Sequence, residues 1–89
     1  MPATDTARRF PLLTVYSRTY CHLCDDMLAA LHTLQGRFAF ELRVVDVDAD
    51  AALESRFGDK VPVLMHGEHE LCHYFLEEPV VTAFLSNLR

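Results

Sequence analysis

The 89-residue chain is long enough for one small domain, and its content of 51% hydrophobic and 24% charged residues is typical of a globular protein. Its formal net charge of -5 argues against nucleic-acid binding, which usually requires a clustered basic face. No apolar stretch approaches the ~20 residues of a membrane-spanning helix, so we expect no membrane partner.

The N-terminal segment 1–11, MPATDTARRFP, has no apolar core of the kind found in secretory signals. We expect it to be a short flexible leader before one domain that covers 12–89. The protein is therefore expected to be cytoplasmic, in a compartment where stable structural disulfides are rare. Three cysteines cannot all pair within one chain. A close cysteine pair in this setting is more typical of catalysis or metal binding than of a structural bridge.

Hydrophobic periodicity predicts four strands and three helices in the order βαβα-ββα. The predicted strands cover 12–16, 38–47, 61–65 and 70–73, and the predicted helices cover 22–35, 49–57 and the segment from 77 onward. A strand, a crossover helix and a strand imply parallel pairing, whereas the last two strands form an antiparallel hairpin. The sequence therefore predicts an α/β fold with a four-stranded mixed sheet flanked by helices.

The second predicted strand and the acidic segment after it carry two further expectations. Residues 38–44 alternate between apolar and polar, and the VVDV that follows suggests a strand end buried on both faces. Asp46, Asp48 and Asp50 lack the glycine and the terminal glutamate of a calcium-binding loop. We expect them to cap the following helix instead.

The segment TYCHLC, residues 19–24, places two cysteines where the first strand gives way to the first helix. Cys24 continues the apolar stripe of that helix and should point inward, while Cys21 lies before the first turn at an exposed tip. A helix N-terminus directs unpaired N–H groups and partial positive charge at such a thiol, which stabilises the thiolate. This arrangement predicts thiol–disulfide exchange in which Cys21 attacks and Cys24 resolves the mixed disulfide.

The residues around the pair leave alternatives open. Asp25 and Asp26 oppose a thiolate, Arg18 favours one, and His22 favours one only when it is protonated or donates a hydrogen bond. The pair could instead be inert core cysteines, or the fold could be an adaptor without turnover. A metal-binding or metal-delivery module is a third alternative. Its ligands would be Cys21 and Cys24 with Cys72 and a histidine, His73 or His22, since tetrahedral zinc takes four N or S ligands.

Two motifs resemble those of the small glutaredoxin-like proteins of the thioredoxin fold, in a divergent bacterial branch. They are LLTVYSRTYCHLC, residues 12–24, and DKVPVLMHGEHEL, residues 59–71. The resemblance implies a dithiol–disulfide oxidoreductase in which a cis proline, here Pro62, lies beside the cysteine pair. It further implies that the backbone of Val61 positions an extended substrate and that Arg18 meets a substrate carboxylate. We add Tyr20 and His22, which flank Cys21, as substrate-binding candidates.

The chain departs from the family pattern at three places. The usual Cys-Pro-Tyr-Cys is Cys-His-Leu-Cys here, and Lys60 replaces the usual threonine before Val-Pro. The Gly-Gly whose amides meet the carboxylate of glutathione is replaced by bulkier residues in the run Leu71-Cys72-His73-Tyr74. We therefore expect glutathione to act as a reductant or co-substrate without tight binding.

The remaining expectations concern Cys72 and the partners of the protein. Cys72 lies on the fourth predicted strand, either as a packed residue or as an additional redox thiol. We expect no bound cofactor, since the cysteine pair itself carries the electrons. The expected partners are a disulfide-containing protein or a low-molecular-weight thiol, with glutathione or a thioredoxin-type protein as the reductant. The domain is expected to be a monomer.

Overall fold

The computed structural model describes residues 10–87 of the chain. Its elements are β1 (Leu12–Ser17), α2 (His22–Leu34), β2 (Glu41–Asp46), the 3-10 turn η1 (Val47–Ala49), α3 (Ala51–Phe57), β3 (Val63–His66), β4 (His69–His73) and α4 (Glu78–Asn87). The predicted order βαβα-ββα is confirmed. Most of the expected leader 1–11 lies outside the described residues, and the carbonyl of Pro11, inside them, accepts a hydrogen bond from the Glu41 amide at 2.8 Å.

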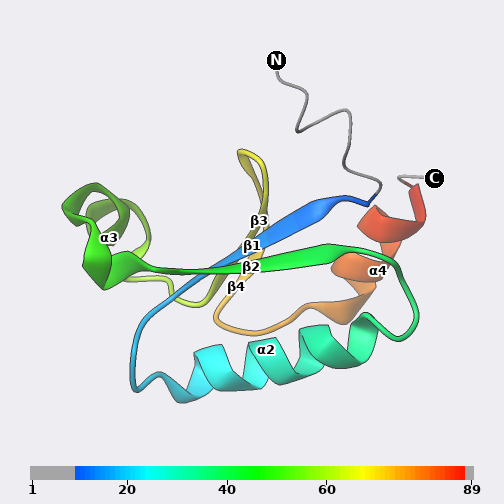
Figure 1. Cartoon of the computed structure of the whole chain (residues 1–89), viewed down its shortest axis with the longest axis horizontal. Coiled ribbons are helices and arrows are strands. Elements are labelled where there is room, and N and C mark those ends of the chain that lie inside the picture. Colours follow the sequence, from blue (N-terminus) through cyan, green and yellow to red (C-terminus); the bar gives the residue numbers. More distant parts are fainter. Residues whose placement is uncertain (1–9, 88–89) are drawn as a thin grey trace.

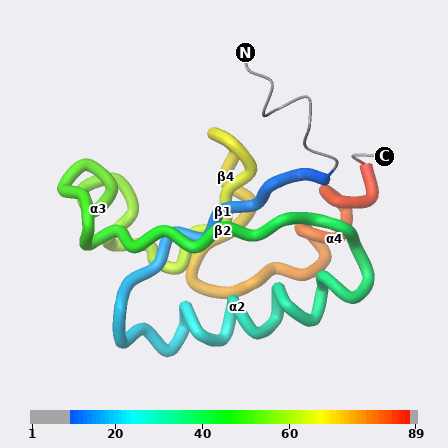
Figure 2. Tube along the Cα trace, in the orientation of Figure 1, coloured from blue at the N-terminus to red at the C-terminus, as the bar shows by residue number. Residues whose placement is uncertain are grey.

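The strands form one four-stranded mixed sheet in the order β2-β1-β3-β4. β1 runs parallel to β2 and antiparallel to β3, and β3 pairs antiparallel with β4, as expected for a crossover followed by a hairpin. The long helix α2 and the C-terminal α4 lie along one face of the sheet, while α3 lies beyond one end of it (Figure 1). The trace in Figure 2 follows the crossover from β1 through α2 to β2. No helix of the described residues is long and apolar enough to cross a membrane.

The main core lies between the sheet and the helices α2 and α4. Alternation along β1 directs Leu13 and Val15 to this side, where both are fully buried. The apolar face of α2 packs against them through Met27 and Leu31, which are 2% and 0% exposed. The other buried members of this core are Leu34, Phe40, Leu64, Leu71, Cys72, Val81 and Leu85. This packing fixes where α2 begins, and therefore where the cysteine pair lies.

A smaller core lies on the opposite face, under α3. It contains Val47, Phe57, Val63 and Met65, with Tyr16, Leu53 and Val61 packed against it. The rings of Tyr16 and Phe57 stack with their centroids 4.2 Å apart, which joins α3 to the C-terminal end of strand β1.

The expectation that the second strand is buried on both faces at its end is wrong. β2 begins only at Glu41 and is an edge strand whose Val44 side chain is 51% exposed. Phe40 lies in the connection before the strand but still packs in the core at 5% exposure. The physical reason is strand order, since β2 has a neighbour on one side only and the short α3 does not extend over it.

Asp50 caps α3, as the sequence predicts. Its Oδ1 accepts hydrogen bonds from the amides of Ala52 at 2.8 Å and Leu53 at 3.4 Å. Asp46 accepts from the amide of Asp48 at 2.9 Å and starts η1 in the same way. These side chains satisfy helix N–H groups that have no partner within the helix.

A cluster of charged side chains joins β4 to the segment before Pro62. Glu70 binds Lys60 Nζ at 2.8 Å through Oε1 and His73 Nδ1 at 2.6 Å through Oε2. The hydrogen bond from Lys60 is the main cause that lowers the pKa of the Glu70 carboxyl group, and the hydrogen bond from His73 lowers it further. The cluster holds Lys60, and with it the segment that carries the proline, against the end of the hairpin.

We predict that Asp50→Ala lowers the free energy of unfolding by about 1 kcal/mol, because two amides of α3 lose their acceptor. Asp50→Asn should retain most of the stability, since asparagine is an equally good cap. Urea unfolding followed by circular dichroism measures both changes. An Asp50→Ala protein as stable as the parent would contradict a stabilising role for this cap.

The Glu70 cluster predicts a specific pH dependence of stability. Because the pKa of Glu70 is lower in the folded chain, its contribution is complete above the ordinary carboxyl value of 4.5 and is lost as pH falls through the folded value. The stability difference between the parent and Glu70→Gln should therefore be largest near neutral pH and should shrink in acid. Urea unfolding at several pH values tests this.

The matched control is Glu68→Gln, which removes a carboxylate that pairs with Arg56 but is 86% exposed. Such an exposed pair contributes little to stability, so its variant should differ little from the parent across the same range. A Glu70→Gln difference that stays constant with pH would overturn the assignment.

Candidate active site at one end of the sheet

Three segments meet at the end of the sheet where β1 finishes. β1 pairs Tyr16 with Val63 of β3, so the loop that follows β1 lies opposite the residues that precede β3. β4 pairs His73 with the same Val63, which brings the end of β4 to this edge as well. The amide of Tyr74 donates to the carbonyl of Pro62 at 2.8 Å and joins the last two segments directly. The loop before Cys21, the Val61-Pro62 pair and the residues after β4 therefore surround one site.

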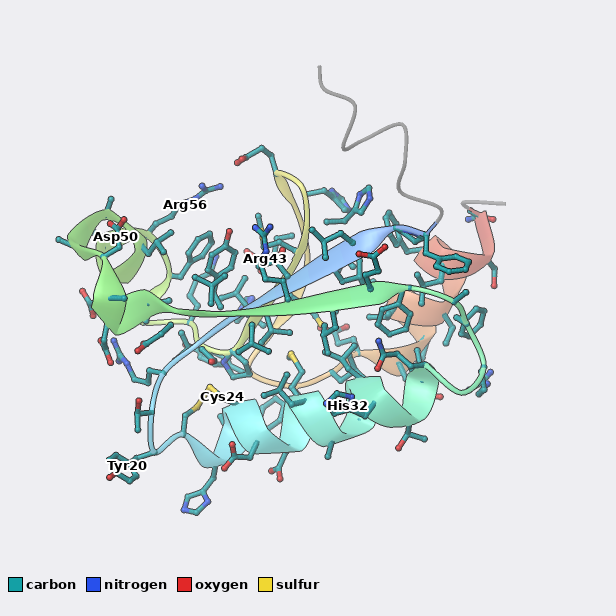
Figure 3. All side chains as sticks on the ribbon, in the orientation of Figure 1. Tyr20, Cys24, His32, Arg43, Asp50 and Arg56 are labelled. Atoms are coloured by element: carbon teal, nitrogen blue, oxygen red, sulfur yellow. A yellow bond between two sulfur atoms is a disulfide. The ribbon has the colours of Figure 1, made fainter. Side chains whose placement is uncertain are left out.

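The cysteine pair lies at the start of α2. Cys21 is the N-cap of the helix, with an extended backbone, and it is joined to Cys24 by a disulfide with the two Cα atoms 5.2 Å apart. The amide of Cys24 donates a hydrogen bond to Sγ of Cys21 at 3.1 Å. Cys24 is 2% exposed, whereas Cys21 is partly exposed, in agreement with the expected inner and outer thiols. Figure 3 shows Cys24 at the first turn of α2.

This geometry suits nucleophilic sulfur chemistry at Cys21. The sulfur occupies the place where serine or aspartate usually accepts a hydrogen bond from the helix. An N–H directed at that sulfur stabilises negative charge on it, and the helix dipole acts in the same direction. The buried sulfur of Cys24 lies behind it, within bonding reach.

Val61 and Pro62 precede β3 at the same site, and the peptide bond between them is cis. Pro62 is fully buried, whereas Val61 is half-buried. The substrate-positioning role that the resemblance implies for this pair stays a prediction.

Arg18 lies in the loop before Cys21, but its guanidinium is already engaged. Nη2 contacts Asp48 at 3.1 Å and Glu54 at 3.0 Å, and Nη1 donates to the carbonyl of Gly58 at 3.4 Å. The hydrogen bond with Glu54 is the main cause that raises the pKa of Arg18, and the hydrogen bond with Asp48 raises it further. Its Nε is buried and has no hydrogen-bond partner among the described residues. Arg18 therefore ties the cysteine loop to α3, and its predicted contact with a substrate carboxylate stays a prediction.

Two tyrosines at this end of the sheet have a left-handed backbone. Tyr20 and Tyr74 have φ angles of 58° and 66°, a conformation that is rare for bulky residues. The side chain of Tyr20 is 100% exposed and points away from the ribbon in Figure 3. Tyr74 is 41% exposed, and its hydroxyl donates to the carbonyl of Asp59 at 2.9 Å. His22, the other flanking candidate, is also exposed.

Phe75 is a residue at this site that sequence analysis missed. It follows Tyr74 and is 65% exposed. The available signal was the aromatic pair directly after a strand, at the position where the family pattern has small residues. Its exposure could not be inferred from the local pattern, because an apolar residue after a strand is more often packed against the core.

Cys72 is separate from the redox pair. Its thiol is free, 3% exposed and packed among the apolar side chains between sheet and helices, and this burial raises its pKa. Within residues 10–87, no three His, Cys, Asp or Glu side chains are placed so that they could hold a metal ion. The third ligand that the metal-binding alternative needs is therefore not brought to Cys21 and Cys24 in this structure.

Comparison with known families and structures assigns the fold independently. A family model described as a glutaredoxin-like domain (DUF836) matches residues 12–86. A protein from Nitrosomonas europaea, solved by NMR, is 42% identical over 88% of this chain and 94% of its own, with a TM-score of 0.78. A protein from X. campestris, solved by X-ray crystallography, is also 42% identical over 84% and 96% of the two chains, with a TM-score of 0.68.

More distant similarity shows the fold alone. The germline-specific thioredoxin Deadhead of Drosophila melanogaster is 18% identical over 97% of this chain and 88% of its own, with a TM-score of 0.61. No curated protein gives a significant match to the chain. The expected thioredoxin fold is confirmed, and the chain belongs to the glutaredoxin-like domain family, which covers nearly its whole length.

Proposed function

We propose that the protein is a thiol–disulfide oxidoreductase that cycles between the dithiol and the disulfide of Cys21 and Cys24. The observation that carries the proposal is the hydrogen bond from the Cys24 amide to Sγ of Cys21, at 3.1 Å, on a sulfur that is partly exposed. The family assignment and the disulfide between the two cysteines support redox chemistry of this kind.

In the reductive direction the proposed reaction has two steps. The Cys21 thiolate attacks one sulfur of a substrate disulfide, and that S–S bond breaks as a new one forms; the released substrate sulfur takes up a proton. Cys24 then gives up its proton and attacks Sγ of Cys21, which releases the second substrate thiol. Two electrons and two protons have passed to the substrate, and Cys21 and Cys24 are left as a disulfide.

An external thiol reductant must return the pair to its dithiol form. Two monothiol molecules, such as glutathione, or one dithiol, such as a thioredoxin-type protein, supply the two electrons. No bound cofactor enters this cycle. Val61, which precedes Pro62 and β3, is proposed to align the substrate backbone beside Cys21.

We predict a single reversible two-electron transition when the protein is equilibrated in buffers of stepped thiol-to-disulfide ratio. Alkylation followed by mass spectrometry should show Cys21 and Cys24 protected together on the oxidising side. Cys72→Ala should leave the midpoint unchanged, because Cys72 is packed away from the pair. Cys24→Ser should abolish the internal transition and accumulate a mixed disulfide at Cys21. The absence of an intramolecular disulfide at every ratio would sink the proposal.

A second prediction separates the capping role of Cys21 from its chemistry. Under reducing conditions Cys21→Ala should be about 1 kcal/mol less stable than Cys21→Ser, because serine can accept the Cys24 amide hydrogen bond and alanine cannot. Both variants should be redox-inactive. Urea unfolding measures the difference, and equal stabilities would show that the sulfur contributes nothing to the start of α2.

A further inference from the structure

We infer that the substrate disulfide is carried by an extended polypeptide with apolar and basic residues beside its cysteine, and that Tyr20, Tyr74 and Phe75 select this partner over glutathione disulfide. The inference rests on the proposed function of Cys21 and Cys24. It assigns a recognition surface, which we call the aromatic rim, to these three side chains.

Half of the large exposed hydrophobic side chains in residues 10–87 lie at the end of the sheet that carries the cysteine pair. Six large hydrophobic side chains are exposed among the described residues: Phe10, Tyr20, Val44, Tyr74, Phe75 and Val80. The three members of the aromatic rim all lie at the end of the sheet that carries the cysteine pair, by chain position or by strand register. Exposed aromatic side chains gathered around a reactive group are typical of a surface that binds another chain.

Tyr20 makes the strongest case, because among the described residues its side chain gains no burial that would offset its backbone conformation. Its backbone is left-handed, which is unfavourable for a residue with a bulky side chain, and its side chain is fully exposed. It directly precedes Cys21. The loop holds a large aromatic ring in water next to the attacking sulfur, where a bound polypeptide would cover it.

The side chain of Tyr74 covers backbone that a glycine at this position would leave exposed. Its amide donates a hydrogen bond to the carbonyl of Pro62, and its hydroxyl donates one to the carbonyl of Asp59. The ring also meets His73 edge-on, with centroids 4.7 Å apart. With this amide occupied and the ring held over the segment before Pro62, a small carboxylate ligand finds no free backbone donor at Tyr74.

The charges around the pair do not favour an anionic ligand. Arg18 is paired with Asp48 and Glu54, and Lys60 is paired with Glu70. The acidic side chains of Asp25 and Asp26, in contrast, are exposed at the start of α2. Two exposed carboxylates near the start of the helix that Cys21 caps attract basic residues and repel carboxylates, so the surface is complementary to an apolar and basic polypeptide.

The test measures how fast the fully reduced protein is oxidised by three defined probes. The first is oxidised glutathione, and the second is a disulfide-linked dimer of a short peptide with leucine and arginine on both sides of its cysteine. The third is the same peptide dimer with glutamate in place of arginine. The two-electron exchange is the one described above, with the probe as oxidant. We expect the leucine–arginine probe to react at least about tenfold faster than either of the other two, since tenfold corresponds to one well-buried contact.

Variants of the aromatic rim should change the ratio of the rates. Tyr20→Ala and Phe75→Ala should each lower the preference for the leucine–arginine probe over oxidised glutathione by about tenfold. Tyr74→Gly should raise the rate with oxidised glutathione, because it removes the ring that Asp59 holds over the segment before Pro62, whereas Tyr74→Phe, which keeps the ring, should not. Val80 is an apolar residue on α4 that is 43% exposed. The variant Val80→Ala is therefore the matched control and should leave the preference unchanged.

A protein that oxidised glutathione oxidises as fast as the leucine–arginine probe would overturn the inference while leaving the proposed function intact. Equal slowing of all probes by the rim variants would do the same, since it would indicate general damage to the site. The midpoint of the cysteine pair, measured for each variant, separates damage from lost recognition. If no probe oxidises the pair and no internal disulfide forms, both the inference and the proposed function fail.

Discussion

The hydrogen bond between the Cys24 amide and the sulfur of Cys21 links the fold of this protein to its chemistry. Helices usually begin with an oxygen acceptor from serine, threonine, aspartate or asparagine, and here a sulfur takes that place. The group that starts α2 is therefore the group that is proposed to react. Any interaction that positions the first turn of α2 also positions the reactive sulfur.

The apolar core holds the first turn of α2 in place through side chains farther along the helix. Met27 and Leu31 hold α2 against Leu13 and Val15 of β1, and these side chains are almost completely buried. Cys24 lies on the same face of the helix and is drawn inward with them, which leaves Cys21 outside. The asymmetry between the outer thiol, which is proposed to attack, and the inner thiol, which is proposed to resolve, follows from amphipathic packing and requires no specialised residue at the site.

The surroundings of the pair are set by contacts between segments distant in sequence. Arg18 reaches Asp48 and Glu54 in the region of α3, and Lys60 and His73 share Glu70. These ionic contacts hold the loops at the end of the sheet and also pair the charges of Arg18 and Lys60 with carboxylates. The same interactions that stabilise the site thus leave it with aromatic and acidic character, which supports the class of partner proposed above.

Features that depend on near neighbours could be predicted from the amino-acid sequence. The period of the α2 stripe predicted which cysteine is buried, Asp50 was recognisable as a cap, and the strand–helix–strand–hairpin order with its two motifs predicted the thioredoxin fold. Other features depend on how distant segments pack together. Val44 is exposed because strand order makes β2 an edge, and that order cannot be read from periodicity. The partners of Arg18 are 30 and 36 residues away, and the left-handed backbone of Tyr20 and Tyr74 is imposed by how the loops are held at the end of the sheet. Such features depend on long-range contacts, which form only when the whole chain is folded.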